Sequence, residues 1–100
     1  MRGGQSWGLT MQSIISNEKR CYLTGSKFKL EKHHCMNGAA YRKKAEHDGL
    51  WVWLNADVHR AVHSNRPDWK RELKRIAQEA YERTHTREEW MHRYHKNYLE

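Results

Sequence analysis

The fold is clearest in one continuous segment of the chain, Leu50-Trp51-Val52-Trp53-Leu54-Asn55-Ala56-Asp57-Val58-His59-Arg60-Ala61-Val62-His63. It opens with five apolar residues in a row, which is typical of either a short buried strand or the entry to a packed helix. Asn55 or Asp57 can then cap a helix that carries His59 and His63. Residues four apart lie on one side of a helix, so we expect these two imidazoles to grip a metal ion together.

Upstream of this segment, the sequence predicts a β-hairpin. Residues 21–24 (Cys-Tyr-Leu-Thr) lead into Gly25-Ser26, after which apolar and charged residues alternate up to Glu31. Two short strands around a Gly-Ser turn fit this pattern, and the second strand ends at the His33-His34 pair. Neighbouring strand residues point to opposite faces, so His33 and His34 should do different jobs. Residues 36–49, with an Asn-Gly step and a basic run, predict a loop with no more than a helical turn.

Downstream of it, the sequence predicts two helices. Residues 65–68 (Asn-Arg-Pro-Asp) break the pattern, and Pro67 suits the first turn of a new helix. Apolar residues then recur at helical spacing as far as Tyr81, which predicts a packing stripe. Thr86 and Glu89 have the spacing of a capping box and open a last helix. That helix carries Trp90, Met91 and Tyr94.

The chain has 100 residues, enough for one small domain. No run approaches the ~18 apolar residues of a membrane span, and two cysteines are too few for a secreted disulfide scaffold. The first residues lack a hydrophobic signal-peptide core, so we expect a cytoplasmic protein. We divide the chain into a flexible N-terminal arm (1–18) that orders partly near residues 11–15, a core (19–66), and a helical extension packed on it (67–100).

The positive charge is concentrated in one part of the sequence. The formal net charge is +7, and the segment from Lys19 to Lys44 holds eight basic residues and one acid. Such a block favours a surface that faces nucleic acid, although a solvated basic face that aids solubility is the alternative. The best candidate phosphate contacts are Arg42, Lys43, Lys44 and Arg60. For Lys70, Arg71, Lys74 and Arg75, a solvated helix face is favoured over an extension of the DNA surface.

The histidines suggest a hydrolytic centre. Three neutral imidazoles, those of His33, His59 and His63, can hold one divalent cation and leave positions open for phosphate or water. His34 is then free to remove a proton from an attacking water molecule. Either histidine pair alone is more often structural. The two pairs together, in this order and beside this charge, favour hydrolysis of a phosphodiester bond.

These residues resemble the HNH endonucleases, a family with the ββα-metal fold. The resemblance rests on the run from Leu30 to His34, the Asn37-Gly38 step, and Leu54 followed by His59 and His63. It implies an α+β fold in which a ββα-metal core is extended by two C-terminal helices. It also implies that His33, His59 and His63 bind the metal and that His34 is the general base.

Over residues 19–99 the chain is also similar to small phage HNH-like proteins of the recombination-enhancement, RecA-dependent nuclease type. This similarity implies DNA as substrate, a role in phage recombination or DNA processing, a RecA-type filament as partner, and the host cytoplasm as location. The shared features are His33-His34, Arg42-Lys43-Lys44, the run from Gly49 to Leu54, His59, and the closing Asn97-Tyr98-Leu99.

Two departures from the HNH pattern stand out. Many members add a zinc held by two Cys-x-x-Cys pairs, but Thr24 stands where the partner of Cys21 would be, so we expect Cys21 to be a small buried residue. The middle Asn of the family name also lacks a counterpart, because Leu50 occupies that position. Asn55 lies too close to His59 to replace it.

The sequence therefore predicts a metal-dependent DNA endonuclease that uses one divalent ion, Mg²⁺ or Zn²⁺ or else Mn²⁺ or Ni²⁺, and has no membrane partner. One alternative is a non-catalytic nucleic-acid-binding module in which His33, His59 and His63 hold a structural metal. Another is a degenerate nuclease fold that serves protein contact.

Overall fold

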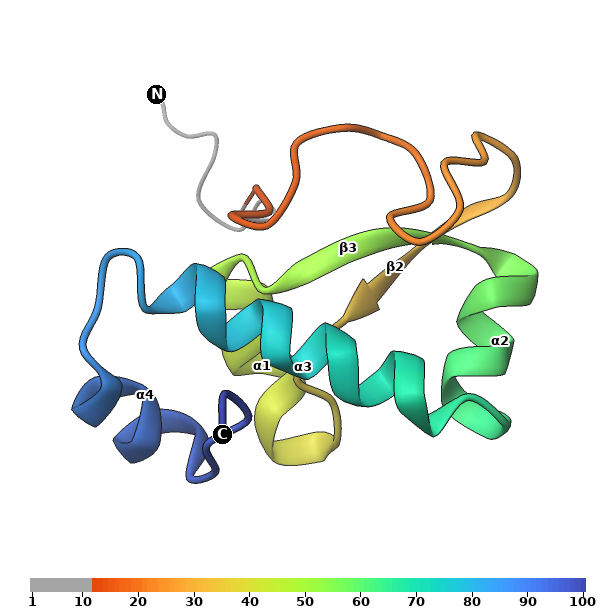
Figure 1. Cartoon of the computed structure of the whole chain (residues 1–100). Coiled ribbons are helices and arrows are strands. Elements are labelled where there is room, and N and C mark those ends of the chain that lie inside the picture. Colours follow the sequence, from red (N-terminus) through yellow and green to blue (C-terminus); the bar gives the residue numbers. More distant parts are fainter. Residues whose placement is uncertain (1–11) are drawn as a thin grey trace.

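The computed structural model describes residues 12–100, so the first eleven residues of the expected N-terminal arm lie outside the described part. The described chain is α+β, as predicted, and it has a two-stranded antiparallel sheet and four helices (Figure 1). In chain order the elements are β2 (Leu30–His34), α1 (Ala39–Asp48), β3 (Trp51–Asn55), α2 (Ala56–Ser64), α3 (Pro67–Tyr81) and α4 (Arg87–Tyr94).

Only the second strand of the predicted hairpin is in the sheet, as β2. β2 pairs with β3, in a register that sets His33 opposite Val52 and His34 opposite Trp51. Residues 50–54 thus enter a buried strand, which was one of the two readings of this apolar run. A whole helix, α1, separates the paired strands in sequence.

The prediction of a first strand at residues 21–24 was wrong, because these residues form a turn. The backbone N–H of Gly25 donates to the carbonyl of Cys21 at 2.7 Å, and that of Cys21 donates to Ser26 at 2.7 Å. Tyr22 donates its N–H to the carbonyl of Trp53 at 2.9 Å, so this segment lies against β3 instead of β2. Cys21 is buried, as expected.

The loop predicted for residues 36–49 is mostly helix α1, so that prediction was wrong too. Gly38 and Gly49, which resemble turn glycines in the sequence, are the residues that bound the helix. Gly49 has a φ of +74° and donates its N–H to the last turn, as glycine commonly does after a helix. Ala45 is the only buried residue of α1, so the helix has no apolar stripe that a sequence pattern could show.

Helix α2 begins as predicted, with Asn55 as its cap. The Asn55 side chain accepts from the N–H of Asp57 at 2.9 Å and donates to the carbonyl of Phe28, also at 2.9 Å. Asn55 thereby joins the start of α2 to the chain that enters β2. These two bonds fix the helix relative to the strand that carries His33.

The two predicted C-terminal helices are confirmed. α3 has Pro67 in its first turn, and Thr86 and Glu89 form the capping box of α4. The buried face of α3 and the α4 residues Trp90 and Tyr94 join the same apolar cluster as the strand residues. That cluster includes Leu50, Val52, Leu54, Val62, Leu73, Ala77, Tyr81, Trp90 and Tyr94.

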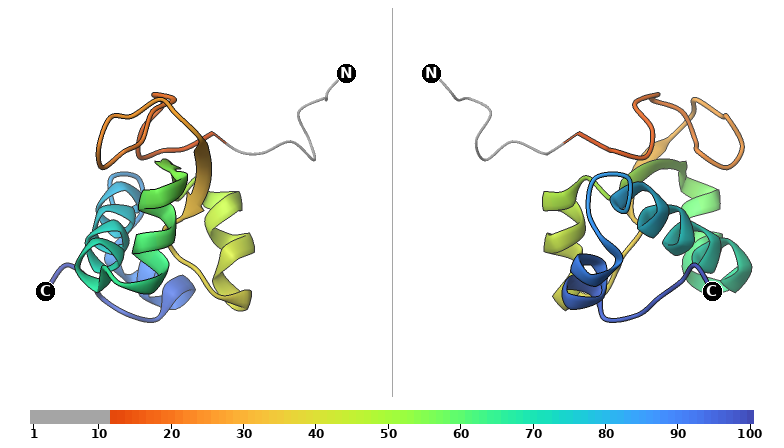
Figure 2. Two further views of the ribbon diagram at one scale, coloured as in Figure 1. Left: turned by 90° about the vertical axis from the view of Figure 1, so that its right-hand side faces the viewer. Right: turned by 60° about the vertical axis from the view of Figure 1, so that its left-hand side comes forward.

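The helices lie on different sides of the strands. Figure 2 shows α1 on one side of β2 and α2 on the other, with α3 beyond α2. Residues 12–29 run along the side of the strands that faces away from α3 and α4. Asp48, at the end of α1, accepts hydrogen bonds from Arg93 and from the Tyr94 hydroxyl at 2.5 Å each, and so ties α1 to α4. None of the described helices has the length and apolar character needed to cross a membrane.

Candidate metal centre

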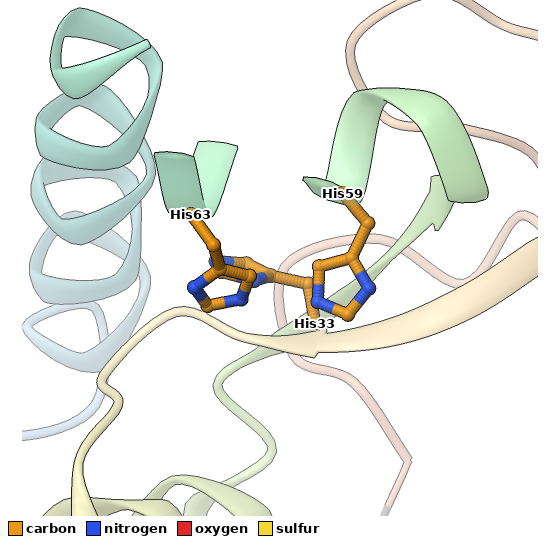
Figure 3. A group of neighbouring side chains, drawn as sticks. All are labelled: His33, His59 and His63. Atoms are coloured by element: carbon orange, nitrogen blue, oxygen red, sulfur yellow. The ribbon is translucent and has the colours of Figure 1, made fainter. Parts of the chain in front are cut away.

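Three histidines converge between β2 and α2 (Figure 3). His33 projects from the strand, and His59 and His63 project from successive turns of the helix. The ring centroids of His33 are 5.3 Å from those of His59 and 5.2 Å from those of His63, and the two helix rings are 4.9 Å apart. One nitrogen of each imidazole lies within 4.8 Å of the other two, close enough for a single ion to bind all three.

His33 is the histidine whose surroundings point most clearly to a bound ion. Its side chain is 1% exposed, and neither ring nitrogen has a hydrogen-bond partner. Burial, followed by repulsion from His59 and His63, lowers the pKa of His33 to about 3. A neutral, buried imidazole with an unused lone pair is costly unless something binds it, and a metal ion would satisfy it.

His59 is held by a carboxylate. Its Nδ1 lies 2.8 Å from Oε1 of Glu31, which leaves Nε2 as the nitrogen available to an ion. In Figure 3 one nitrogen of His59 accordingly faces the other two histidines and the other is turned away. Carboxylate–histidine pairs of this kind orient ligands in many metal sites and raise their basicity.

The centre is open to solvent on one side, at His63. This histidine is exposed, whereas His33 is buried and His59 is intermediate. Burial of the ring and the nearby charges of His59 and Lys70 lower the pKa of His63, which favours the neutral form that a metal needs. A pocket of about 220 Å³ opens here, lined by Lys32, His34, Asn37, Arg42, His59 and His63.

His34 faces the other way from His33, towards α1, as strand alternation predicts, yet it lines the same pocket. Its Nε2 is 2.7 Å from Oε1 of Glu46, whose carboxylate also accepts from Lys32 at 3.2 Å. Burial raises the pKa of Glu46, but the hydrogen bonds from His34 and Lys32 lower it by more. The carboxylate is therefore ionised and can only accept, so Nε2 of His34 donates to it and Nδ1 is the ring nitrogen left for another partner.

The structure brings only one of the four candidate phosphate contacts into the pocket. Arg42 lines it, whereas Lys43 is exposed on α1 and Lys44 donates to the carbonyl of Arg93 at 3.2 Å. The three residues were expected in a loop, but consecutive residues of a helix cannot face one site. Arg60 lies on α2 in an exposed ion pair with Asp57 and does not line the pocket.

Sequence reasoning missed the two carboxylates of the centre. Glu31 precedes His33 by two residues, so both share one face of β2, and this spacing was visible in the sequence. Glu46 follows Arg42 by four residues and shares its face of α1, a relation that a loop prediction hides. The remaining histidines, His47, His85, His92 and His95, are exposed and take no part.

Comparisons with protein-family models, with curated proteins and with solved structures found no match to this chain.

Proposed function

We propose that the protein is a metal-dependent DNA endonuclease with a ββα-metal core of the HNH type, formed by β2, β3 and α2. The observation that carries the proposal is the buried His33, with two unpartnered ring nitrogens, at the meeting point of His59 and His63. A fourth histidine, His34, lines the adjoining pocket with a free Nδ1. A binding module with a structural metal has no need of this fourth histidine.

His33, His59 and His63 would hold the ion. Three imidazoles suit Zn²⁺ or Ni²⁺ better than Mg²⁺ or Mn²⁺, which prefer oxygen ligands. When bound, the ion would polarise the scissile phosphate and stabilise the leaving oxygen. Glu31 keeps His59 in the tautomer that leaves Nε2 free for the ion.

His34 would act as the general base. Glu46 fixes its ring through Nε2 and leaves Nδ1 to accept a proton from water. The imidazolium that results is stabilised by the same carboxylate. Lys32 keeps Glu46 ionised and, together with Arg42, supplies positive charge beside the phosphate.

The test is cleavage of supercoiled plasmid and of single-stranded circles by the wild type and by His34→Ala. Zn²⁺, Mn²⁺, Ni²⁺ and Mg²⁺ are added in turn, each with and without a RecA filament. Loss of a general base costs 10²–10⁴-fold in rate, so the variant should be nearly inactive. Its metal content and melting temperature should match those of the wild type, and His92→Ala, at an exposed site, serves as the matched control.

Each outcome separates the two functions. Cleavage that disappears in a folded, metal-loaded His34→Ala supports the endonuclease. DNA binding without cleavage under any condition, by a protein that still binds one ion, would instead assign a nucleic-acid-binding module. Equal cleavage by His34→Ala and wild type would remove His34 from the mechanism.

A further inference from the structure

A second positively charged site lies between α3 and the C-terminal tail. A pocket of about 310 Å³ is lined there by Pro67, Lys70, Arg71, Lys74, Lys96, Asn97 and Tyr98. Four of these residues are basic, and none of the described lining residues is acidic. The charge comes from two segments, because Lys96 approaches from the tail while the other three follow α3.

The tail is held in place by a buried side chain. Gln78 of α3 is fully buried, accepts from the N–H of Tyr98 at 2.6 Å and donates to Oδ1 of Asn97 at 3.0 Å. The Tyr98 ring lies between two ammonium groups, 5.6 Å from Nζ of Lys74 and 5.4 Å from Nζ of Lys96. The tail segment that closes the pocket is therefore held against α3 by the fold.

The cations of this pocket have no counter-ions. Within residues 12–100, Lys70, Arg71, Lys74 and Lys96 form no ion pair, and residues 1–11 contain no acid. Arg75, on another face of the same helix, is by contrast paired with both Glu72 and Glu79. Burial and the charges of Lys70 and Lys96 lower the pKa of Lys74, so the positive charges repel one another. An anion bound there would relieve that repulsion.

The pocket is also close to the metal centre. Lys70 lies near the start of α3, and α3 packs against α2, so one end of the cation row lies beside the helix that carries His59 and His63. From there the row continues along α3 to Lys74 and on to Lys96 of the tail. This geometry suits a chain of phosphates that enters at one site and continues to the next.

We infer that the pocket formed by Lys70, Arg71, Lys74, Lys96 and Tyr98 binds a backbone phosphate of the nucleic-acid strand whose scissile phosphate lies at the metal centre. The inference rests on the proposed function and adds a second contact to it. A solvated helix face, which the sequence predicts for four basic residues of α3, remains our assignment for Arg75. For Lys70, Arg71 and Lys74 we propose the phosphate site instead.

The test compares two doubly substituted proteins that lose the same charge. Lys74→Gln with Lys96→Gln removes half of the pocket's cations, and Arg75→Gln with Arg83→Gln removes two cations that do not line it. Binding of a fluorescent twelve-nucleotide oligo-dT is measured by anisotropy at several salt concentrations, with EDTA present so that no strand is cut. Circular dichroism checks the fold of each protein. If the first pair fails to fold, Lys70→Gln with Lys96→Gln takes its place.

We expect the pocket variant to bind about tenfold more weakly at low salt. The slope of log K against log salt should fall by about 0.7, because one lost single-strand phosphate contact contributes about that much. The control pair should keep the wild-type slope. Equal weakening in the two pairs would overturn the inference. Inorganic phosphate that binds only the wild type, and does not displace the oligonucleotide from it, would also overturn the inference, because the pocket would then be a site for free phosphate.

Failure of this inference differs from failure of the endonuclease. Weaker binding by the pocket variant, together with no cleavage by the wild type with any metal, would support the phosphate site and contradict the endonuclease proposal. Cleavage by the wild type, together with unchanged strand binding by the pocket variant, would support the endonuclease proposal and contradict the phosphate site.

Discussion

At the scale of single residues, the most informative side chain is one that the isolated protein leaves unsatisfied. His33 occupies a strand position where the alternation calls for an apolar residue, and both of its ring nitrogens lack partners. A buried polar group without a hydrogen bond costs about 1–3 kcal/mol. The fold therefore carries a cost at His33 that a bound metal ion would offset.

The first prediction removes that cost. His33→Leu should make the metal-free protein about 1–2 kcal/mol more stable, since an apolar side chain of similar size needs no partner. The same change should abolish binding of Zn²⁺, because one of three ligands is gone. Urea unfolding in EDTA and isothermal titration with zinc measure the two effects. A less stable His33→Leu would mean that the His33 ring is satisfied by the fold itself.

The second prediction concerns pH. The pKa of His33 is about 3 in the folded protein against 6.5 for a free histidine, so the unfolded chain takes up its proton first as the pH falls. The part of the free energy of unfolding that depends on a neutral His33 is fully present above about pH 6.5 and is lost progressively towards pH 3. Urea midpoints in EDTA should therefore be lower at pH 5.5 than at pH 7.5. His33→Leu should show a smaller drop, with a remainder from His63, whose pKa is also lowered. Equal drops in the two proteins would contradict the assignment.

The third prediction tests the carboxylate behind His59. Glu31→Gln keeps the shape but removes the charge that orients the ring, so affinity for zinc should fall about 10–100-fold. Competition with a coloured chelator measures the change, and Glu88→Gln, at an exposed site, is the control. An unchanged zinc affinity in Glu31→Gln would show that this pair is only a surface contact.

At the scale of elements, the sequence predicts what is local and misses what is not. The Asn55 cap, Pro67 and the Thr86–Glu89 capping box predict the starts of α2, α3 and α4, and each of these signals acts within one turn. The partner of β2 is another matter. β3 and the turn at residues 21–24 both offered apolar residues, and only tertiary packing selects β3.

The same reasoning applies to the site. His33, His59 and His63 were predicted as ligands because a residue type and a helical spacing point to them. The assignment of Glu46 depends on α1, which has a single buried residue and glycines at both ends, so no pattern marks it as a helix. Side chains brought together by an unmarked element cannot be predicted from spacing alone.

The fourth prediction concerns the end of α1. Gly49 has a left-handed φ, and a Cβ there would lie 2.5 Å from the carbonyl oxygen of Gln12. Gly25 has a similar φ of +81° but open space around it. Gly25→Ala should cost about 1 kcal/mol for the backbone strain alone, and Gly49→Ala should cost clearly more. Urea unfolding of both proteins gives the comparison. Equal costs would mean that the chain at Gln12 moves aside freely.

At the scale of the whole molecule, the metal should act on stability. An ion that binds only the folded protein stabilises it by about 4 kcal/mol when its free concentration is 1,000 times Kd. The fifth prediction is therefore a melting temperature that rises steadily with added zinc and returns to its starting value with EDTA. His33→Leu should show no such rise. Differential scanning fluorimetry measures both, and a zinc response that survives in His33→Leu would place the ion elsewhere.

The positions of the three candidate ligands have a consequence for how the chain unfolds. His33 lies on β2, and His59 and His63 lie on α2, with α1 and β3 between them in sequence. A single ion joining these points turns the intervening chain into a closed loop and removes much of the entropy that its unfolding would gain. α3 and α4 lie outside that loop. With the ion in place, amide hydrogens of the two strands should exchange more slowly than those of the C-terminal helices, an order that composition and burial alone do not impose.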